Sequence, residues 1–275
     1  MNTPLSSNEI MQLQETARTI RARILTVASQ SGCCHIGSSL SPVDLLVALY
    51  FRVMRIDPTQ PQNPQRDRCI LSKGHGALGL YATLETRGFF PASHLDVYGK
   101  DNTVLAVHPV HGSAPGIEAT SGALGHGLPM GLGLALAARH DSAPWRTFVV
   151  LSDGECDEGS TWEAAMLAGH LRANNLIALV DYNKSQGFGM TKDVIDLEPF
   201  TTKWESMGWE VREVNGHDFT EIVTALESPR LTDKPLVLIA HTVKGKGVSY
   251  MENTVDWHYK NLKPEDLAAA VAELG

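Results

Sequence analysis

The chain has 275 residues, 43% hydrophobic and 20% charged, which suffices for one large α/β domain with a buried core. Its net charge of −8, with both signs interspersed, leaves no basic stripe for nucleic acid or an anionic membrane. No apolar run approaches the ~20 residues that span a bilayer, and the N-terminal residues are polar, so we expect a cytoplasmic protein. The four cysteines form no CxxC pair, which argues against a zinc site or disulfide framework.

Two helices are predicted near the N-terminus. Apolar residues recur at helical spacing over Ser7–Ser31, and Gly32 is a residue type that commonly ends a helix. A second helix is predicted over residues 41–54, with the serine at its start as the cap. Pro42 suits the first helical position, and Asp44 can reach back to the N–H of the capping residue.

Beyond a proline-rich stretch that we interpret as a surface loop, short apolar runs alternate with helical patterns. Predicted strands cover residues 69–71, 147–151, 176–181, 209–214 and 235–241, and predicted helices cover 74–87, 122–140, 158–173, 218–226 and 264–274. The strands are continuously apolar, which is typical of strands buried on both faces. The order predicts right-handed βαβ crossovers and a parallel sheet flanked by helices, in a single domain over residues 1–275.

Polar segments follow four of the five predicted strands, at the edge where open parallel sheets bind ligands. The segment after the fourth strand in the sequence is interpreted as a cap for the next helix. Asp153 and Asn183 end two strands that are separated by one helix, which places them at the same edge. Alone, both are ordinary loop residues. Together, their oxygens and a backbone carbonyl form a partial shell for Mg²⁺, which phosphate oxygens and water characteristically complete.

The segments 151–162 and 181–183 resemble the thiamine diphosphate motif, a Gly-Asp-Gly sequence followed later by Asn. Further segments occur in the order and spacing of transketolases, at 72–76, 108–127 and 242–258. The resemblance covers essentially the whole chain. It implies the thiamine diphosphate-binding fold and the transfer of a two-carbon ketol unit from a ketose to an aldose.

The resemblance also implies which residues hold the diphosphate and its cation. Asp153 and the side-chain oxygen of Asn183 would ligate Mg²⁺, or another divalent cation such as Ca²⁺ or Mn²⁺, together with the backbone carbonyl of Ser185. Gly154 would let the backbone approach the diphosphate, and Glu155 beside it is assigned to the same cofactor-binding segment.

By the same resemblance, residues of a later segment would contact the other end of the cofactor. Gly122, Ala123 and Leu124 would lie against the aminopyrimidine, with Gly122 opening a helix of small residues. A structural helix–helix contact would look similar. Glu158 matches a family position linked to the partner's cofactor-contacting glutamate.

Four histidines match positions that line the cofactor and substrate channel of transketolases: His35, His75, His108 and His258. His75 and His258 are also assigned to cofactor binding. An imidazole can donate and accept protons near neutral pH, as ketol transfer between sugar oxygens requires. Two segments depart from the family pattern, because His35 lies in Cys-His-Ile-Gly instead of Gly-His-Pro-Gly and His126 replaces a common glutamine.

In transketolases, the glutamate that protonates the aminopyrimidine and the residues that bind sugar phosphate lie in a downstream pyrimidine domain, which this sequence lacks. We therefore expect the partner to be a C-terminal transketolase subunit, in an α₂β₂ heterotetramer that acts on sugar phosphates. The chain alone should be inactive, and a fragment of a longer protein would look the same. Alternatives are the α subunit of a 2-oxoacid dehydrogenase, a 1-deoxyxylulose-5-phosphate synthase, and a non-catalytic cofactor-binding paralogue.

Overall fold

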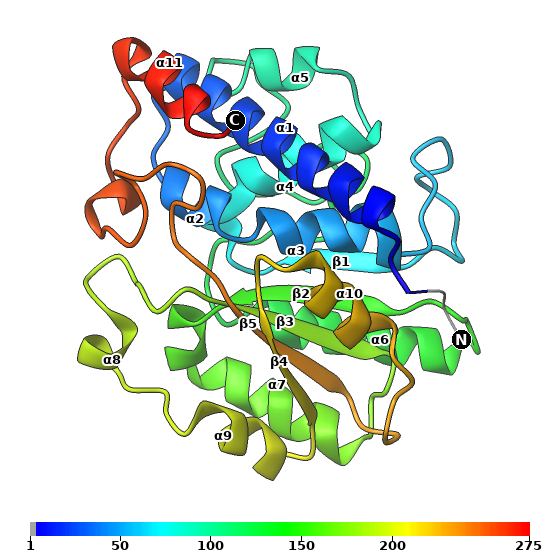
Figure 1. Ribbon diagram of the computed structural model, residues 1–275. Coiled ribbons are helices and arrows are strands. Elements are labelled where there is room, and N and C mark those ends of the chain that lie inside the picture. Colours follow the sequence, from blue (N-terminus) through cyan, green and yellow to red (C-terminus); the bar gives the residue numbers. More distant parts are fainter. Residues whose placement is uncertain (1–3) are drawn as a thin grey trace.

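Five parallel strands form one sheet in the order β1-β2-β3-β5-β4 in the computed structural model, which describes residues 4–275 (Figure 1). The strands are β1 (Arg68–Leu71), β2 (Thr147–Ser152), β3 (Leu176–Tyr182), β4 (Glu210–Asn215) and β5 (Leu236–His241). Every neighbouring pair is parallel. The predicted parallel sheet is therefore confirmed, with each strand end within one residue of its predicted position.

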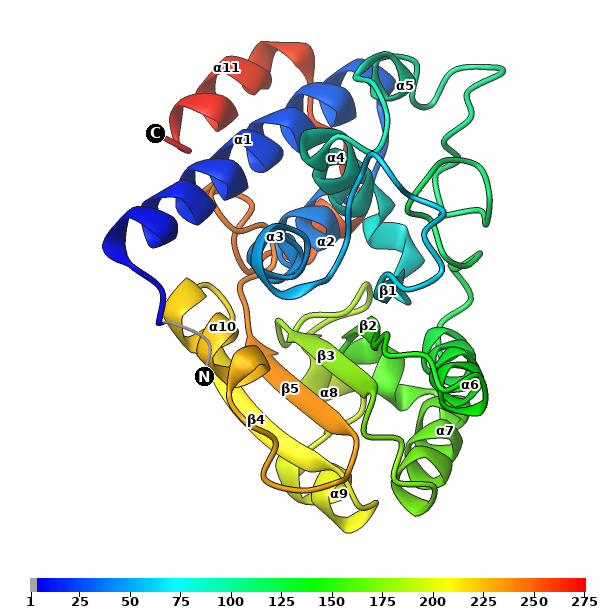
Figure 2. The same cartoon turned by 90° about the vertical axis from the view of Figure 1, so that its right-hand side faces the viewer.

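Helices cover both faces of the sheet (Figure 2). One layer contains α1 (Ser7–Ser31), α2 (Ile36–Leu40), α3 (Val43–Ala48), α4 (Ala77–Arg87), α10 (Phe219–Glu227) and α11 (Pro264–Ala272), and the other contains α6 (Gly127–His140), α7 (Gly159–His170) and α9 (Phe200–Ser206). The short helices α5 (Ser93–Asp96), α8 (Thr191–Val194) and α9 were not predicted from the sequence. The helix over Ser7–Ser31 has the predicted bounds, and Gly32 ends it in the left-handed conformation.

The continuous apolar character of the strands is explained by the two hydrophobic cores. In β2, Phe148 and Val150 belong to the core under α1, α3 and α4, whereas Val149 and Leu151 belong to the core under α6 and α7. Successive strand residues point to opposite faces, so a strand covered on both sides needs apolar residues at every position. The carboxyl edge of the sheet is thus held between two packed layers.

The cap predicted for the second helix is wrong. Ser41 and Pro42 form a turn between α2, which ends at Leu40, and α3, which begins at Val43, and a π-helical turn at Leu49–Val53 follows α3. Ser41 is buried, and its hydroxyl donates to Asp181 at 2.6 Å instead of capping a helix. Asp44 pairs with Arg21 at 2.6 Å. The cap-like residues are used in long-range contacts because this segment lies in the core.

Contrary to the expectation from the sequence, one stretch, the 18 residues Ile36–Val53, is long and apolar enough to cross a membrane by length and composition alone. However, 89% of this stretch is buried inside the fold, where α3 packs against α1. Core helices commonly have this composition. We therefore interpret the stretch as a core element.

The helix predicted from residue 122 begins five positions later, at Gly127. Gly122 and Gly125 have φ values of 138° and 80°, which no right-handed helix contains. Residues 122–126 are therefore a loop that crosses the carboxyl edge of the sheet and joins α6 at Gly127, and we call this segment the loop 122–127. Within α6, Gly131 does allow close packing, because a Cβ there would lie 2.4 Å from the Val149 side chain.

Candidate functional site

The ends of β2 and β3 bring the predicted metal ligands together. Ser152 pairs with Asp181 in the sheet register, so Asp153 and Asn183 follow directly at neighbouring strand ends. Both line one pocket of about 250 Å³, with Gly154 and Ser185. The prediction that the two strand ends meet at one edge is thus confirmed.

The Asp153 carboxylate is buried and organises the loop after β3. It accepts hydrogen bonds from the backbone N–H groups of Gly154 and Lys184, at 2.8 and 2.6 Å, and from the Thr191 hydroxyl at 3.1 Å. Burial, and then the nearby charge of Asp181, raise the pKa of Asp153 to about 6. A divalent cation would reverse this shift, so the environment of Asp153 suits a cation.

The Asn183 amide has a defined orientation. Its Nδ2 donates to Asp181 at 3.3 Å, and its Oδ1 accepts from the Ser185 N–H at 3.1 Å. Within residues 4–275, no group of three His, Cys, Asp or Glu side chains is arranged to hold a metal ion. An ion at this edge would therefore rely on one carboxylate with amide and carbonyl oxygens, a hard donor set that fits Mg²⁺ completed by phosphate.

A buried lysine lies behind these ligands. Lys73 forms an ion pair with Asp181, which also accepts hydrogen bonds from Ser41 and Thr242. Burial opposes ionisation of Asp181, but Lys73 and these hydroxyls outweigh it and lower its pKa. The network ties the ends of β1, β3 and β5 to α2.

Lys244 reaches the same place from the loop after β5. Its Nζ donates to the backbone carbonyls of Ser185 and Gln186, both at 3.1 Å. Burial, and then repulsion by Lys73, lower the pKa of Lys244 to about 8. Neither lysine was singled out from the sequence, although both lie in the polar segments that follow strands, which was the available signal.

The four predicted histidines form one cluster. The ring centroid of His35 lies 5.5 Å from that of His75, 4.9 Å from that of His258 and 6.3 Å from that of His108. Burial, followed by Lys73, lowers the pKa of His75 to about 2, and burial, followed by Lys244, lowers that of His258 to about 3. Both imidazoles are therefore neutral at pH 7 in the cofactor-free chain, and each can donate one hydrogen bond and accept another. The titration near neutral pH that was expected from the sequence is not found for these two rings in the cofactor-free chain.

The replacement His75→Asn should reduce the loss of stability at acidic pH. The folded chain keeps this imidazole neutral, whereas the unfolded chain takes up a proton below its ordinary pKa of 6.5. The unfolded state thus binds more protons than the folded state. As the pH drops below 6.5, the free energy of unfolding of the parent decreases by about 1.4 kcal/mol per pH unit for this one proton. Urea unfolding at pH 7 and 5.5 measures the effect, with exposed His140→Asn as the control. If the free energies of unfolding of variant and parent differed by the same amount at both pH values, the prediction would be wrong.

Only two of the three residues predicted to contact the cofactor from the loop 122–127 line the pocket. Gly122 and Leu124 line the pocket, whereas Ala123 is exposed outside it. The Glu155 carboxylate is buried and faces the backbone of this loop instead of the pocket. Glu158 is exposed beside Gly125 and does not line the pocket.

The pocket suits a diphosphate cofactor that carries a heteroaromatic ring. The Nδ1 atom of His258 is buried and has no hydrogen-bond partner among the described residues, as expected of a group that meets a ligand or water. Lys73 and Lys244 line the same pocket and bring positive charge toward the Asp153 carboxylate. Leu124 adds an apolar wall.

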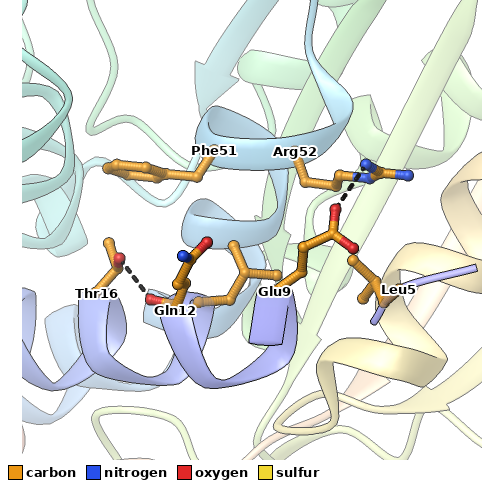
Figure 3. A pocket seen from close by; sticks show the side chains of 7 residues that line it. Leu5, Glu9, Gln12, Thr16, Phe51 and Arg52 are labelled. Atoms are coloured by element: carbon orange, nitrogen blue, oxygen red, sulfur yellow. Dashed lines mark hydrogen bonds and ion pairs between the residues drawn. The ribbon is translucent and has the colours of Figure 1, made fainter. Parts of the chain in front are cut away.

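A second pocket, of about 270 Å³, lies between α1 and the helical turn at Leu49–Val53 (Figure 3). Phe51 and Arg52 line it from one side, and Gln12 and Thr16 line it from α1. The Arg52–Glu9 ion pair, at 3.2 Å, crosses it. None of the residues predicted to form the site lies there, so the carboxyl edge remains the candidate site.

Oxygen donors at the carboxyl edge of a parallel sheet, with a histidine cluster above them, define a cofactor-binding α/β protein. Residues 12–275 match the family model "Transketolase, thiamine diphosphate binding domain". A 6-deoxy-6-sulfo-D-fructose transketolase subunit of Clostridium sp. (strain MSTE9) is 44% identical over 98% of both chains. An apulose-4-phosphate transketolase subunit of Actinobacillus succinogenes is 42% identical over 96% of both. The chain therefore belongs to the transketolase family and contains its thiamine diphosphate-binding domain.

The solved transketolase from Leishmania mexicana has the same fold, with a TM-score of 0.89 at 30% identity. The match covers 99% of this chain but 42% of that one, so the chain spans less than half of the longer enzyme. These similarities confirm the expected fold and the expectation of a transketolase subunit. They favour neither a dehydrogenase α subunit nor a non-catalytic paralogue.

Proposed function

We propose that this chain is the cofactor-binding subunit of a split transketolase, which transfers a two-carbon ketol unit from a ketose to an aldose. One observation carries the proposal. This chain covers nearly the whole length of the two relatives named as transketolase subunits. It covers only about two fifths of the length of the longer transketolases. The two subunits are named for different sugars, so we propose only a ketose donor and an aldose acceptor, with a sugar phosphate as the family default.

Asp153, the Asn183 side chain and the Ser185 carbonyl would hold Mg²⁺ against the diphosphate. Bound thiamine diphosphate would supply the carbon nucleophile and the electron sink. The neutral imidazoles of His75 and His258 would hydrogen-bond to the sugar oxygens. Proton transfer to or from these oxygens would require a bound ligand whose negative charge raises the pKa of the histidines.

The proposed partner carries the pyrimidine domain, in an α₂β₂ heterotetramer. Exposed apolar side chains support a second chain near the site. Phe188 lines the pocket and is 86% exposed, and Met166 and Leu167 on α7 are 52% and 48% exposed. Such side chains are costly to leave in water. The four free cysteines suit the reducing cytoplasm, where we place the complex.

The test is to tag the chain in its native cells, purify it under mild conditions and identify stoichiometric companions by mass spectrometry. We expect one companion of roughly similar size, and ketol transfer that needs both chains, thiamine diphosphate and Mg²⁺. The isolated chain should show no turnover, because the glutamate that activates the cofactor would lie on the partner. Repeated recovery without a companion, or turnover by the chain alone, would overturn the split-enzyme proposal.

A further inference from the structure

The Glu155 carboxylate is fully buried, yet it does not line the cofactor pocket. Its Oε1 accepts hydrogen bonds from the Gly125 N–H at 2.9 Å and from the Ser72 hydroxyl. Its Oε2 accepts one from the Ser152 N–H at 3.3 Å. A buried carboxylate is costly unless donors surround it, and here the donors come from the ends of β1 and β2 and from the loop 122–127.

The same loop is held from its other side. The Ser160 hydroxyl, at the start of α7, donates to the Gly125 carbonyl at 2.8 Å, so both polar groups of residue 125 are bound to side chains. The Gly127 N–H donates to the Ser72 hydroxyl at 3.0 Å. A Cβ on Gly127 would lie 2.1 Å from that hydroxyl, which shows how closely the loop approaches β1.

Leu124 is the loop residue that this arrangement controls. It precedes the clamped Gly125 and lines the pocket, together with Gly122. Because Gly125 adopts a φ of 80°, the backbone turns sharply immediately after Leu124. The position of the Leu124 side chain therefore depends on where Gly125 is bound.

We propose that Glu155 is a positioning residue, which fixes the loop 122–127 so that Leu124 forms the wall against the ring end of the cofactor. This inference rests on the proposed function. It assigns Glu155 no contact with the diphosphate or the cation, in contrast to the role expected from the sequence. Glu155→Gln tests it, because the amide offers one acceptor oxygen and places an NH₂ group against at least one N–H or O–H donor.

The first readout needs no cofactor. Hydrogen exchange of residues 122–128, followed by mass spectrometry on the assembled complex, should be about tenfold faster in Glu155→Gln, the size expected for one lost hydrogen bond to a charged group. The matched control is Glu210→Gln. Glu210 is also buried and bonded to Arg212, but it lies at the start of β4, away from the loop. The amide oxygen in Glu155→Gln can still accept the Gly125 N–H if it takes the place of Oε1, so Glu155→Ala, which removes both acceptor oxygens, is measured beside it. Unchanged exchange in both variants would overturn the proposal.

The second readout is binding at saturating Mg²⁺, measured by fluorescence titration. Glu155→Gln should weaken thiamine diphosphate about tenfold and leave inorganic diphosphate unchanged, because Asp153 and Asn183 are untouched. Equal weakening of both ligands would mean that Glu155 acts on the diphosphate end, which would overturn the proposal. If the unmodified complex failed to bind thiamine diphosphate, the proposed function would fail while the exchange result still stood. Should Glu155→Gln not fold, Ser72→Ala removes one donor and is judged by the same readouts.

Discussion

Asp153→Ala should abolish Mg²⁺-dependent retention of thiamine diphosphate in the assembled complex. The change removes the only carboxylate of the proposed cation site, and it also releases the Lys184 N–H and the Thr191 hydroxyl. Loss of residues that merely orient metal ligands costs about 10–100-fold in affinity, so loss of a ligand should cost at least ~100-fold. Fluorescence titration of the cofactor at fixed Mg²⁺ measures the effect.

Two further variants separate the loss of a cation ligand from general damage. Asp193→Ala removes an exposed carboxylate from the nearby helix α8 and should bind like the parent. Asp153→Asn keeps an acceptor for the Lys184 N–H but loses the charge, so the fold should persist while the Mg²⁺ concentration needed for binding rises. Unchanged cofactor affinity in Asp153→Ala would refute the metal assignment.

The sequence was most informative where a local pattern and the overall topology require the same residues. Buried parallel strands need continuous apolar runs, so the strand bounds could be predicted closely. Chain order then placed Asp153 and Asn183 at the same edge, because parallel strands that are linked by a helix end on the same side. The histidine cluster could be inferred only from the resemblance, because nothing in the spacing of His35, His75, His108 and His258 predicts that they meet.

The predictions failed where residues that form a familiar local pattern instead contact distant parts of the chain. Ser41 and Asp44 look like a helix cap, but they bind Asp181 and Arg21 from elements distant in the chain. The glycine-rich run from Gly122 was predicted as helix because small residues suit close helix packing. The structure instead uses two of those glycines for positive φ in a loop.

The Lys73–Asp181 pair was missed for the same reason. The two residues belong to different polar segments, and their pairing depends on β1 and β3 lying on either side of β2. Lysine after a strand is an ordinary solvated residue, and only its burial in the structure shows otherwise. Sequence patterns therefore predicted where the site lies, but they did not predict the buried charges that stabilise it.

Lys73→Met should destabilise the chain by about 3–5 kcal/mol, the usual cost of leaving one member of a buried ion pair without its partner. Methionine fills similar volume, so the loss reflects the charge of Asp181 more than a cavity. Urea unfolding at pH 7 measures it. The double variant Lys73→Met/Asp181→Asn should recover part of the loss, because the amide is neutral and still accepts a hydrogen bond from Ser41 or Thr242.

The pH dependence of this loss distinguishes charge from packing. Lys73 helps to lower the pKa of Asp181 below 3.8 in the parent, so its contribution is complete above that value and is lost only as the pH falls through the lowered pKa. Without the lysine, burial raises the pKa of Asp181, and the folded variant takes up a proton before the unfolded chain does. The stability difference between parent and variant should therefore be largest at neutral pH and narrow as the pH falls toward 4. A difference that is constant with pH would show that Lys73 acts through packing alone.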